Sequence, residues 1–340
     1  MTIFEEEILQ QQYLLTRTVE ANADAVSDLA EEIGSGKYVA AAVVARGSSR
    51  NACEYFKYAL ERYTGMPVLF IEPSVTAVYG GKLALKNFLL FAVSQSGKAE
   101  DISSVVRAAK ESGAKVVAVT NNPDSPLAKA ADVRLLLNVG QEKAVAATKT
   151  FLAQMTVFTS LVDAVRGEKA EINSVLSKLF VTRHKLKPIA EALAKEKDLF
   201  VLGRGLSYSS ATETALKFKE ACYLNATAYR VSEFQHGPFA VLDENRSVLL
   251  FVSDDETKDG CIKVAKRIRE TGARLYAFVS DGVELTADYC YVLPHADAAL
   301  LVDYRNDLRH VLTSSGRLRA LFRVFPILTS YLLYCLLQCL

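Results

Sequence analysis

The stretch VVARGSS (43–49) occurs twice in slightly different form, since it returns as VLGRGLS (201–207). At nearly the same spacing the chain also repeats LLFAVS (89–94) as LLFVS (249–253) and ESGAKVVAV (111–119) as ETGARLYAF (270–278). Chance matches would not preserve their spacing across two intervening elements, so the chain contains a duplicated domain. Each copy alternates apolar strands, glycine turns and helical segments, which is the pattern of parallel βαβ units. The sequence therefore predicts an α/β fold with two tandem subdomains, each built on a parallel sheet flanked by helices.

The two copies differ at the place where ligands of such folds bind, the carboxyl ends of the strands. After its second core strand the first copy carries SQSG (94–97), whereas the second copy carries SDDE (253–256). Hydroxyl and amide groups suit a bound anion, and consecutive carboxylates repel one. We therefore expect the first copy to hold the binding site.

Length and composition narrow the class of protein. The 340 residues suffice for two domains, and 50% are hydrophobic, enough for two covered sheets. With 40 basic and 39 acidic residues the net charge is +1, and no basic stripe interleaved with aromatic residues indicates a nucleic-acid partner. The acidic amino terminus, MTIFEEEILQQQ (1–12), is unlike a signal peptide. The 6 cysteines show neither a CxxC pair nor metal-ligand spacing, which predicts reduced core thiols, a cytoplasmic location, no metal and no cofactor.

Helix and turn signals divide the chain into three parts. A helical segment fills residues 1–34. The first subdomain covers 35–170, and the charged break Arg166-Gly167-Glu168-Lys169 precedes its boundary. A helix over 172–194 then leads into the second subdomain, which covers 171–340.

The apolar run 320–340 at the carboxyl terminus has two interpretations. Its 21 residues are long enough to span a bilayer. However, Arg323 and Pro326 near one end leave only about 14 uninterrupted apolar residues, a length typical of a helix buried in a protein core. We therefore expect a core helix and no membrane partner.

Two strand-end turns in the first copy predict a cradle for a phosphate. Ser94, Gln95 and Ser96 stand between an apolar strand and a helix that begins with acids. Two hydroxyls, an amide and the backbone N–H groups of a helix start can bind an anion there. The turn Gly47-Ser48-Ser49 ends the neighbouring strand and would form a second wall. Ordinary helix capping by serine is the alternative for either turn alone, but two such turns at one end of a sheet favour binding.

A second set of residues has the types that transfer protons. Glu213, Lys217 and Glu220 recur at helical spacing on one face, where Lys217 can hold the Glu220 carboxylate ionised. His236 precedes Gly-Pro and is expected on a loop, where functional residues concentrate. The alternative is a solvated ion-pair face with one loop histidine. Spacing alone leaves both interpretations open.

Four motifs resemble the SIS (sugar isomerase) family. They are ARGSS (45–49), SQSGKAEDI (94–102), AVAATKTF (144–151) and ETALKFKEACYLNATAYRVSEFQHGP (213–238). The likeness extends over most of the chain, and it is strongest to the isomerase domain of glucosamine-6-phosphate synthase and to SIS-type glucosamine-6-phosphate deaminases. Within residues 45–80 the sequence resembles the deaminases more than the synthase. The resemblance implies two flavodoxin-like SIS subdomains and a homodimer with shared active sites.

The resemblance also implies a role for each matching residue. Those that would bind the phosphate of a sugar 6-phosphate are Ser49, Ser94, Gln95 and Ser96. Val145 and Ala147 would line the sugar. Lys217 would support Glu220, which would carry a proton between C1 and C2 of the sugar. The partner subunit's His236 would open the sugar ring.

Three features depart from the family pattern, two of them at single positions and one at the carboxyl end. Ala99 stands two residues after the SQSG glycine, where the family usually has Thr or Ser, so one hydroxyl for the phosphate is missing. Asn225 occupies the place of a histidine of the synthase. The sequence ends at CLLQCL (335–340), without the polar segment whose lysine closes over the sugar in family members.

The resemblance and the acid–base residues together predict an aldose–ketose isomerase or deaminase that acts on an amino-sugar or ketose 6-phosphate. A general base would remove a proton next to a carbonyl or imine to form an enediol or enolamine. The sequence contains no glutaminase domain, which favours a deaminase or plain isomerase over a synthase. A non-catalytic sugar-phosphate-binding protein is the alternative. Glu220 and His236 favour the enzyme, whereas Ala99 and the missing lysine favour the binding protein.

Overall fold

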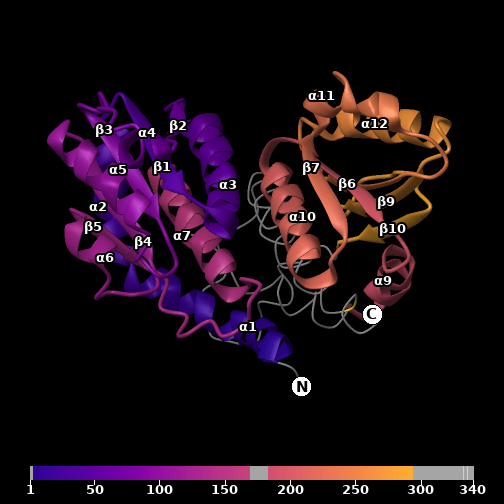
Figure 1. Cartoon of the computed structure of the whole chain (residues 1–340), viewed down its shortest axis with the longest axis horizontal. Coiled ribbons are helices and arrows are strands. Elements are labelled where there is room, and N and C mark those ends of the chain that lie inside the picture. Colours follow the sequence, from indigo (N-terminus) through magenta and orange to yellow (C-terminus); the bar gives the residue numbers. More distant parts are fainter. Residues whose placement is uncertain (1–2, 169–182, 294–331, 333–334, 336–340) are drawn as a thin grey trace. The chain divides into compact units, whose positions relative to one another are not determined.

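The chain folds into two compact units in this computed structural model, which describes residues 3–168, 183–293, 332 and 335. One unit comprises Tyr13–Ala170, and the other comprises Met1–Gln12 together with Glu171–Leu340. Each unit contains one parallel sheet with helices on both sides (Figure 1). The predicted α/β fold with two tandem subdomains is therefore confirmed.

Five parallel strands form the sheet of the first unit, in the order β2-β1-β3-β4-β5. They are β1 (Ala40–Ala45), β2 (Val68–Phe70), β3 (Phe88–Val93), β4 (Lys115–Thr120) and β5 (Val133–Leu136). The central strands β1 and β3 consist entirely of apolar residues, AAAVVA and FLLFAV, because helices cover both sides of the sheet. β1 and β3 pair over their whole length, so that Ala45 lies beside Val93 at their carboxyl ends.

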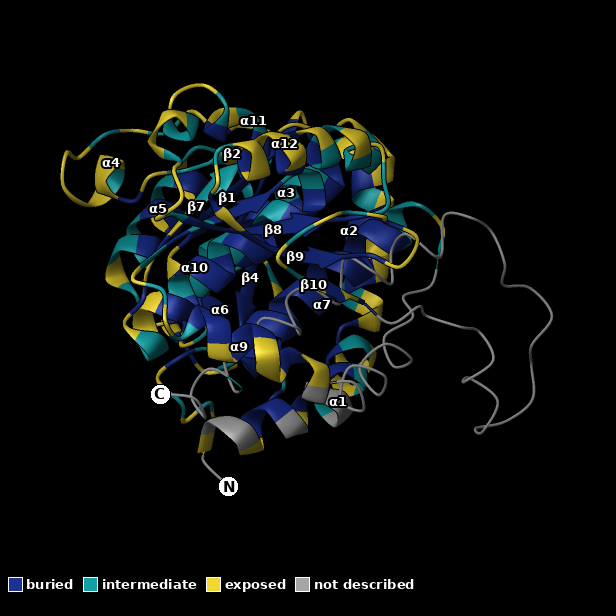
Figure 2. Ribbon diagram, turned by 90° about the vertical axis from the view of Figure 1, so that its right-hand side faces the viewer, coloured by how far each residue is buried: buried dark blue, intermediate teal, exposed yellow. Residues whose placement is uncertain are grey.

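The helices of the first unit form a layer on each face of the sheet. On one face, α3 (Gly47–Thr64) and α2 (Ala23–Gly34) both pack against α7 (Lys149–Val165). On the other face lie α5 (Glu100–Glu111) and α6 (Pro126–Ala130), and α4 (Ser74–Ala77) contacts α5. Figure 2 shows strands that are buried between helices whose outer faces are exposed.

The second unit repeats this topology with the strand order β10-β9-β8-β6-β7. Its strands are β6 (Asp198–Gly203), β7 (Asn225–Arg230), β8 (Ser247–Val252), β9 (Arg274–Val279) and β10 (Tyr289–Val292). In each sheet the first strand of the unit lies between the second and the third, which is the flavodoxin-like order. The two sheets therefore confirm the duplication.

Helices also cover both faces of the second sheet. α10 (Tyr208–Cys222) packs against β6 and β7 on one face, whereas α11 (Val231–Phe234) and α12 (Lys258–Glu270) enclose the core on the other. Short helical segments complete the unit: η1 (Arg183–Leu186), α9 (Lys187–Leu193), η2 (Gly205–Ser207) and η3 (Pro238–Val241).

Two helix predictions differ from the structure. Instead of one helical segment before the first strand, α1 (Ile3–Ala21) and α2 are separated at Asn22. The buried Asn22 side chain accepts a hydrogen bond from the N–H of Leu136 and donates one to its carbonyl, which ties the break to β5. In addition, α3 already begins at Gly47, so Ser49 belongs to the first turn of a helix rather than to a separate turn.

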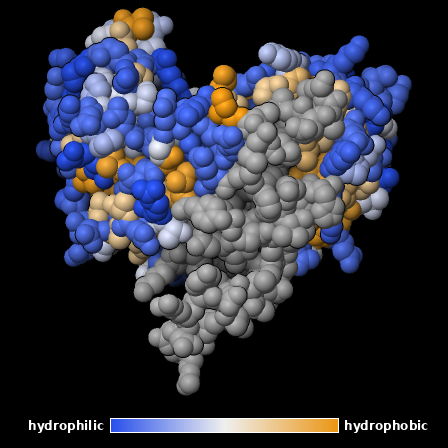
Figure 3. All heavy atoms as spheres, turned by 90° about the horizontal axis from the view of Figure 1, so that it is seen from below, coloured by the Kyte–Doolittle hydropathy of each residue, from blue (hydrophilic) through white to orange (hydrophobic). Residues whose placement is uncertain are grey.

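Other predictions on the helices fall partly outside the described residues. The predicted helix over 172–194 is described only from η1 onward, and the run 320–340 only at Leu332 and Cys335. Within the described part of the chain, every helix is too short or too polar to cross a bilayer. On the face that Figure 3 shows, the described surface is mostly hydrophilic, with apolar residues in small separate groups.

The sequence predicted that the cysteines are core residues, and this is only partly correct. Cys53 and Cys261 are buried, but Cys222 is half-buried and Cys290 is exposed. Burial raises the pKa of the Cys222 thiol to about 12 and that of Cys261 to about 11. Both thiols are therefore protonated at neutral pH and are poor nucleophiles.

Candidate active site

The carboxyl ends of β1 and β3 form the edge at which a fold of this strand order binds ligands. α3 follows β1 on one face of the sheet, and the SQSG turn and α5 follow β3 on the other. Because Ala45 and Val93 are paired, the start of α3 and the SQSG turn are neighbours. The structure thus brings together the two strand-end segments that the sequence assigned to phosphate.

The SQSG turn is held in place by one of its own hydroxyls and by the next strand. Ser94 Oγ accepts a hydrogen bond from the N–H of Gly97 at 3.2 Å, and Gly97 has a φ of 64°. The Gln95 carbonyl accepts a hydrogen bond from the N–H of Asn121, just after β4, at 3.0 Å. The backbone of the turn is therefore fixed, while the side chain of Ser96 stays exposed.

An ion pair joins the two strand-end segments. Arg46, the last residue before α3, pairs with Asp101 in the first turn of α5. Ala99 precedes α5 and supplies no side-chain hydrogen bond to that turn. The missing hydroxyl noted in the sequence thus leaves the start of α5 without a side-chain cap.

The close packing at Gly97 predicts a large loss of stability for Gly97→Ala. The added Cβ would lie 2.3 Å from Oγ and 2.5 Å from Cβ of Ser125, whose hydroxyl caps α6, and the backbone is left-handed. The turn or the start of α6 must therefore move, and we expect the free energy of unfolding to fall by about 2–4 kcal/mol in urea denaturation.

Gly36→Ala is the matched control for this variant. Gly36 also has a left-handed backbone, with a φ of 73°, but its Cβ would meet no atom within 4 Å. Backbone strain alone should lower the free energy of unfolding by about 1 kcal/mol. Equal losses for the two variants would show that the contact with Ser125 is unimportant.

Ser49 is held by a residue from α7. Gln154, which is 1% exposed, donates a hydrogen bond from Nε2 to Ser49 Oγ at 2.9 Å. Because Ser49 accepts this hydrogen bond, its own hydroxyl proton is available to an anion. Sequence reasoning missed Gln154, since 105 residues separate it from Ser49 and neither spacing nor composition links them.

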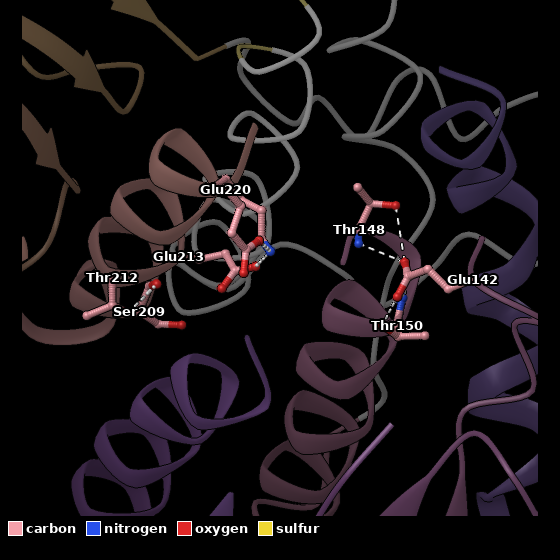
Figure 4. A network of polar contacts seen from close by, with 8 residues as sticks. Glu142, Thr148, Thr150, Ser209, Thr212, Glu213 and Glu220 are labelled. Atoms are coloured by element: carbon pink, nitrogen blue, oxygen red, sulfur yellow. Dashed lines mark hydrogen bonds and ion pairs between the residues drawn. The ribbon is translucent and has the colours of Figure 1, made fainter. Parts of the chain in front are cut away.

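The loop between β5 and α7 carries the two residues that the resemblance assigns to the sugar. Val145 is 95% exposed, and Ala147 is half-buried. In the same loop, Glu142 accepts hydrogen bonds from Thr148 and Thr150 at the start of α7 (Figure 4). Sequence reasoning also missed Glu142, although an acidic residue shortly before a helix start is a signal for a capping contact.

At the corresponding edge of the second sheet, the acidic turn makes its own contacts. Asp254 pairs with Lys258 at 2.6 Å. Asp255 accepts hydrogen bonds from the N–H and the hydroxyl of Thr257 at 2.8 and 2.5 Å. Asp254 and Asp255 therefore occupy the turn before α12 at the positions of Gln95 and Ser96 in the first copy, and this contrast favours the first copy as the anion site.

In the second unit, α10 holds a carboxylate against a buried ammonium group. Lys217 Nζ lies 2.5 Å from Glu220 Oε2 and 3.5 Å from Glu213 Oε1. The side chains of Lys217 and Glu213 are only 3% and 2% exposed, whereas that of Glu220 is 34% exposed. Because Lys217 is buried, this is not the solvated ion-pair face that the sequence left open. The Glu220 carboxylate is oriented by Lys217 and remains accessible to a ligand.

His236 and Asn225 lie near this helix in sequence but in different settings. His236 is exposed on the turn after α11, and its backbone N–H donates to the Glu233 carbonyl at 3.0 Å. Asn225 begins β7 and donates from Nδ2 to Asp198 at 2.6 Å, across the pair of strands β6 and β7. The asparagine that replaces a family histidine thus stabilises the strand pair.

These features define a doubled α/β protein with a hydroxyl-lined strand edge in one copy and a Lys–Glu pair in the other. The SIS domain model matches residues 40–164 and 192–293, and the chain therefore belongs to the SIS domain family. This finding confirms the family that the four motifs indicated.

Relatives of this chain include two enzymes named glutamine–fructose-6-phosphate aminotransferase [isomerizing]. The chain is 33% identical to that of Symbiobacterium thermophilum over 84% of its own length, and 34% identical to that of Sulfolobus acidocaldarius over 73%. It spans 50% and 42% of the length of these two relatives, respectively. The match thus concerns about half of each enzyme.

Among solved structures, a protein of Silicibacter pomeroyi DSS-3 that is assigned as a phosphosugar isomerase matches nearly the whole chain. It is 31% identical, with a TM-score of 0.80, over 99% of this chain and 97% of that protein. The C-terminal domain of glucosamine-fructose-6-phosphate aminotransferase from Francisella tularensis shares the fold, with a TM-score of 0.82 at 24% identity, over 99% of this chain and 96% of that domain.

Proposed function

We propose that this protein is an aldose–ketose isomerase or an amino-sugar-phosphate deaminase that acts on a sugar 6-phosphate. The observation that carries the proposal is the pair on α10, in which the buried Lys217 holds the partly exposed Glu220 at 2.5 Å. A carboxylate that is kept in one orientation and open to a ligand is what a general base needs. Membership of the SIS family supports the same class of reaction. The proposal includes the homodimer and the cytoplasmic location expected from the sequence.

The proposed reaction moves one proton between neighbouring carbons. The hydroxyls and N–H groups at the ends of β1 and β3 would anchor the phosphate. Glu220 would take the proton from the carbon next to the carbonyl, and the C–H electron pair would form the new C=C bond. The π electrons of the carbonyl would move to its oxygen, which takes a proton from water and gives an enediol or enolamine. The protonated Glu220 would then return the proton to the neighbouring carbon, while the hydroxyl or amine on the other carbon loses one proton to water. For an amino sugar this step gives a ketimine, and its hydrolysis by water yields the ketose and ammonia.

One panel of assays separates the possible activities. Ammonia release and aldose–ketose interconversion would be measured with 6-phosphorylated amino sugars and ketoses. Release of ammonia would identify a deaminase, and interconversion without ammonia would identify a plain isomerase. Sugar phosphate that binds without either reaction would contradict the proposal and support a binding protein, the alternative that Ala99 favours by lacking a hydroxyl at the start of α5.

The proposed phosphate site at the SQSG turn predicts that the double variant Ser94→Ala and Ser96→Ala binds sugar phosphate more weakly than the parent. Hydrogen bonds from hydroxyls to a charged group contribute about 1.5–3 kcal/mol each. We therefore expect sugar-phosphate affinity, measured by calorimetry, to fall at least about tenfold. Ser253→Ala, at the position of the second copy that corresponds to Ser94, is the control and should leave affinity unchanged.

The single variant Ser96→Ala makes this test independent of folding. Ser94 Oγ accepts a hydrogen bond from the N–H of the buried Gly97 at 3.2 Å, so its loss could disturb the backbone. Ser96 Oγ accepts a longer one, 3.4 Å, from the N–H of the exposed Lys98, and removal of this exposed side chain should therefore have less effect on stability. Affinity that stays at the parent value in both the single and the double variant would place the phosphate elsewhere.

A further inference from the structure

One carboxylate receives four hydrogen bonds at the start of α7. Glu142 accepts from the N–H of Thr148 at 2.7 Å, from its hydroxyl at 3.3 Å, from the N–H of Thr150 at 3.3 Å, and from the Thr150 hydroxyl. Figure 4 shows the carboxylate facing both threonines. Thr148 and Thr150 are each only 2% exposed, so these donors converge in a buried place.

The charge of Glu142 suits this position. The first N–H groups of a helix lack partners within the helix and carry partial positive charge. Thr148, the residue that precedes α7, makes no side-chain capping contact of its own, so Glu142 supplies the acceptor from six residues away. The segment 142–148 is thereby closed into a loop, and Val145 projects from it.

Both ends of this loop are attached to the strand edge of the candidate site. Asn121, just after β4, donates to the carbonyl of Gly140 at 2.6 Å and accepts from the N–H of Val139 at 3.2 Å. At the other end, α7 carries Gln154, whose amide holds Ser49. All of these contacts lie within the first unit. The loop and the start of α7 therefore connect Asn121, which follows β4, with Ser49, which follows β1.

From this geometry we propose that Glu142 is a positioning residue for sugar-phosphate binding. Its carboxylate holds Val145 and Ala147 in place through the loop, and it steadies Ser49 through α7 and Gln154. The inference rests on the proposed function. A preordered loop lowers the entropy lost on binding, so Glu142 should act on affinity. It supplies no group to the reaction, and the rate with bound sugar should therefore be nearly unchanged.

The test compares Glu142→Ala and Glu142→Gln with the parent. For Glu142→Ala, we expect the Kd for fructose 6-phosphate in calorimetry to rise about tenfold. Solvent-hydrogen exchange into saturating sugar should stay within about twofold of the parent rate. Amide hydrogen exchange at Thr148 and Thr150 should accelerate, while the rest of α7 keeps its protection. Glu142→Gln retains one acceptor oxygen and should recover part of the affinity.

Two further variants make the test specific. Glu111→Ala removes an exposed carboxylate from the end of α5 and should change none of these values. Thr150→Val removes one donor to Glu142. If that hydroxyl acts only through Glu142, Thr150→Val should add nothing to the effect of Glu142→Ala on affinity.

Two results would overturn the inference. The first is unchanged amide exchange at Thr148 and Thr150 in Glu142→Ala, which would show that the carboxylate does not order the loop. The second is faster exchange with an unchanged Kd, which would show that loop order does not serve binding. A failure of the proposed function would look different, because the parent itself would then neither isomerise nor deaminate a sugar phosphate, while amide exchange still reported on Glu142.

Discussion

Glu220→Gln should abolish proton transfer and leave sugar-phosphate binding intact. The amide has the shape of the carboxylate and can still accept the hydrogen bond from Lys217, which lies 2.5 Å from Glu220 Oε2. It cannot take up a proton, so the general base is lost. We expect incorporation of solvent deuterium at C1 or C2 of the bound sugar, followed by NMR, to fall about 10²–10⁴-fold.

The control for this variant is the same substitution at an exposed glutamate of the same unit. Glu270 at the end of α12 is exposed, and Glu270→Gln should exchange deuterium at the parent rate. Lys217 is less suitable as a first target, because its removal would leave the buried Glu213 without its ammonium partner and lower stability. Exchange near the parent rate in Glu220→Gln would assign the base to another group.

Mixing two inactive variants, Glu220→Gln and His236→Ala, should restore about one quarter of the parent activity if each site draws His236 from the neighbouring subunit. Random exchange of subunits makes half of the dimers mixed. In each mixed dimer one of the two sites would contain both an intact Glu220 and an intact His236. Half of the molecules with one good site in two gives one quarter, measured as turnover of the sugar phosphate after subunit exchange.

The control mixture combines Glu220→Gln with Lys217→Ala. Lys217 and Glu220 are bonded within one α10, so every site of a mixed dimer would lack one of them, and no activity should return. If His236, like Lys217, served the site of its own chain and not that of the neighbouring subunit, the first mixture would be equally inactive. That outcome would rule out the shared site.

The strands were predictable because a parallel sheet covered on both faces needs uninterrupted apolar segments. LLFAV in the first copy and LLFV in the second lie in β3 and β8, and their pairing partners follow the same rule. Helix starts were less predictable. α1 and α2 separate at Asn22 because its side chain bonds to Leu136, 114 residues further along the chain, and no local signal records that contact.

The sequence by itself predicts a duplicated α/β protein with hydroxyls after one strand and carboxylates after its counterpart. These properties are local or periodic, so the order of the residues carries them, and the resemblance of four motifs indicated the SIS family. The folded chain was needed to show that Gln154 holds Ser49, that Glu142 closes its loop, and that Lys217 is buried beneath Glu220. Such contacts depend on which helix faces pack together, and packing joins residues as distant as Ser49 and Gln154, which hydrophobic periodicity cannot pair.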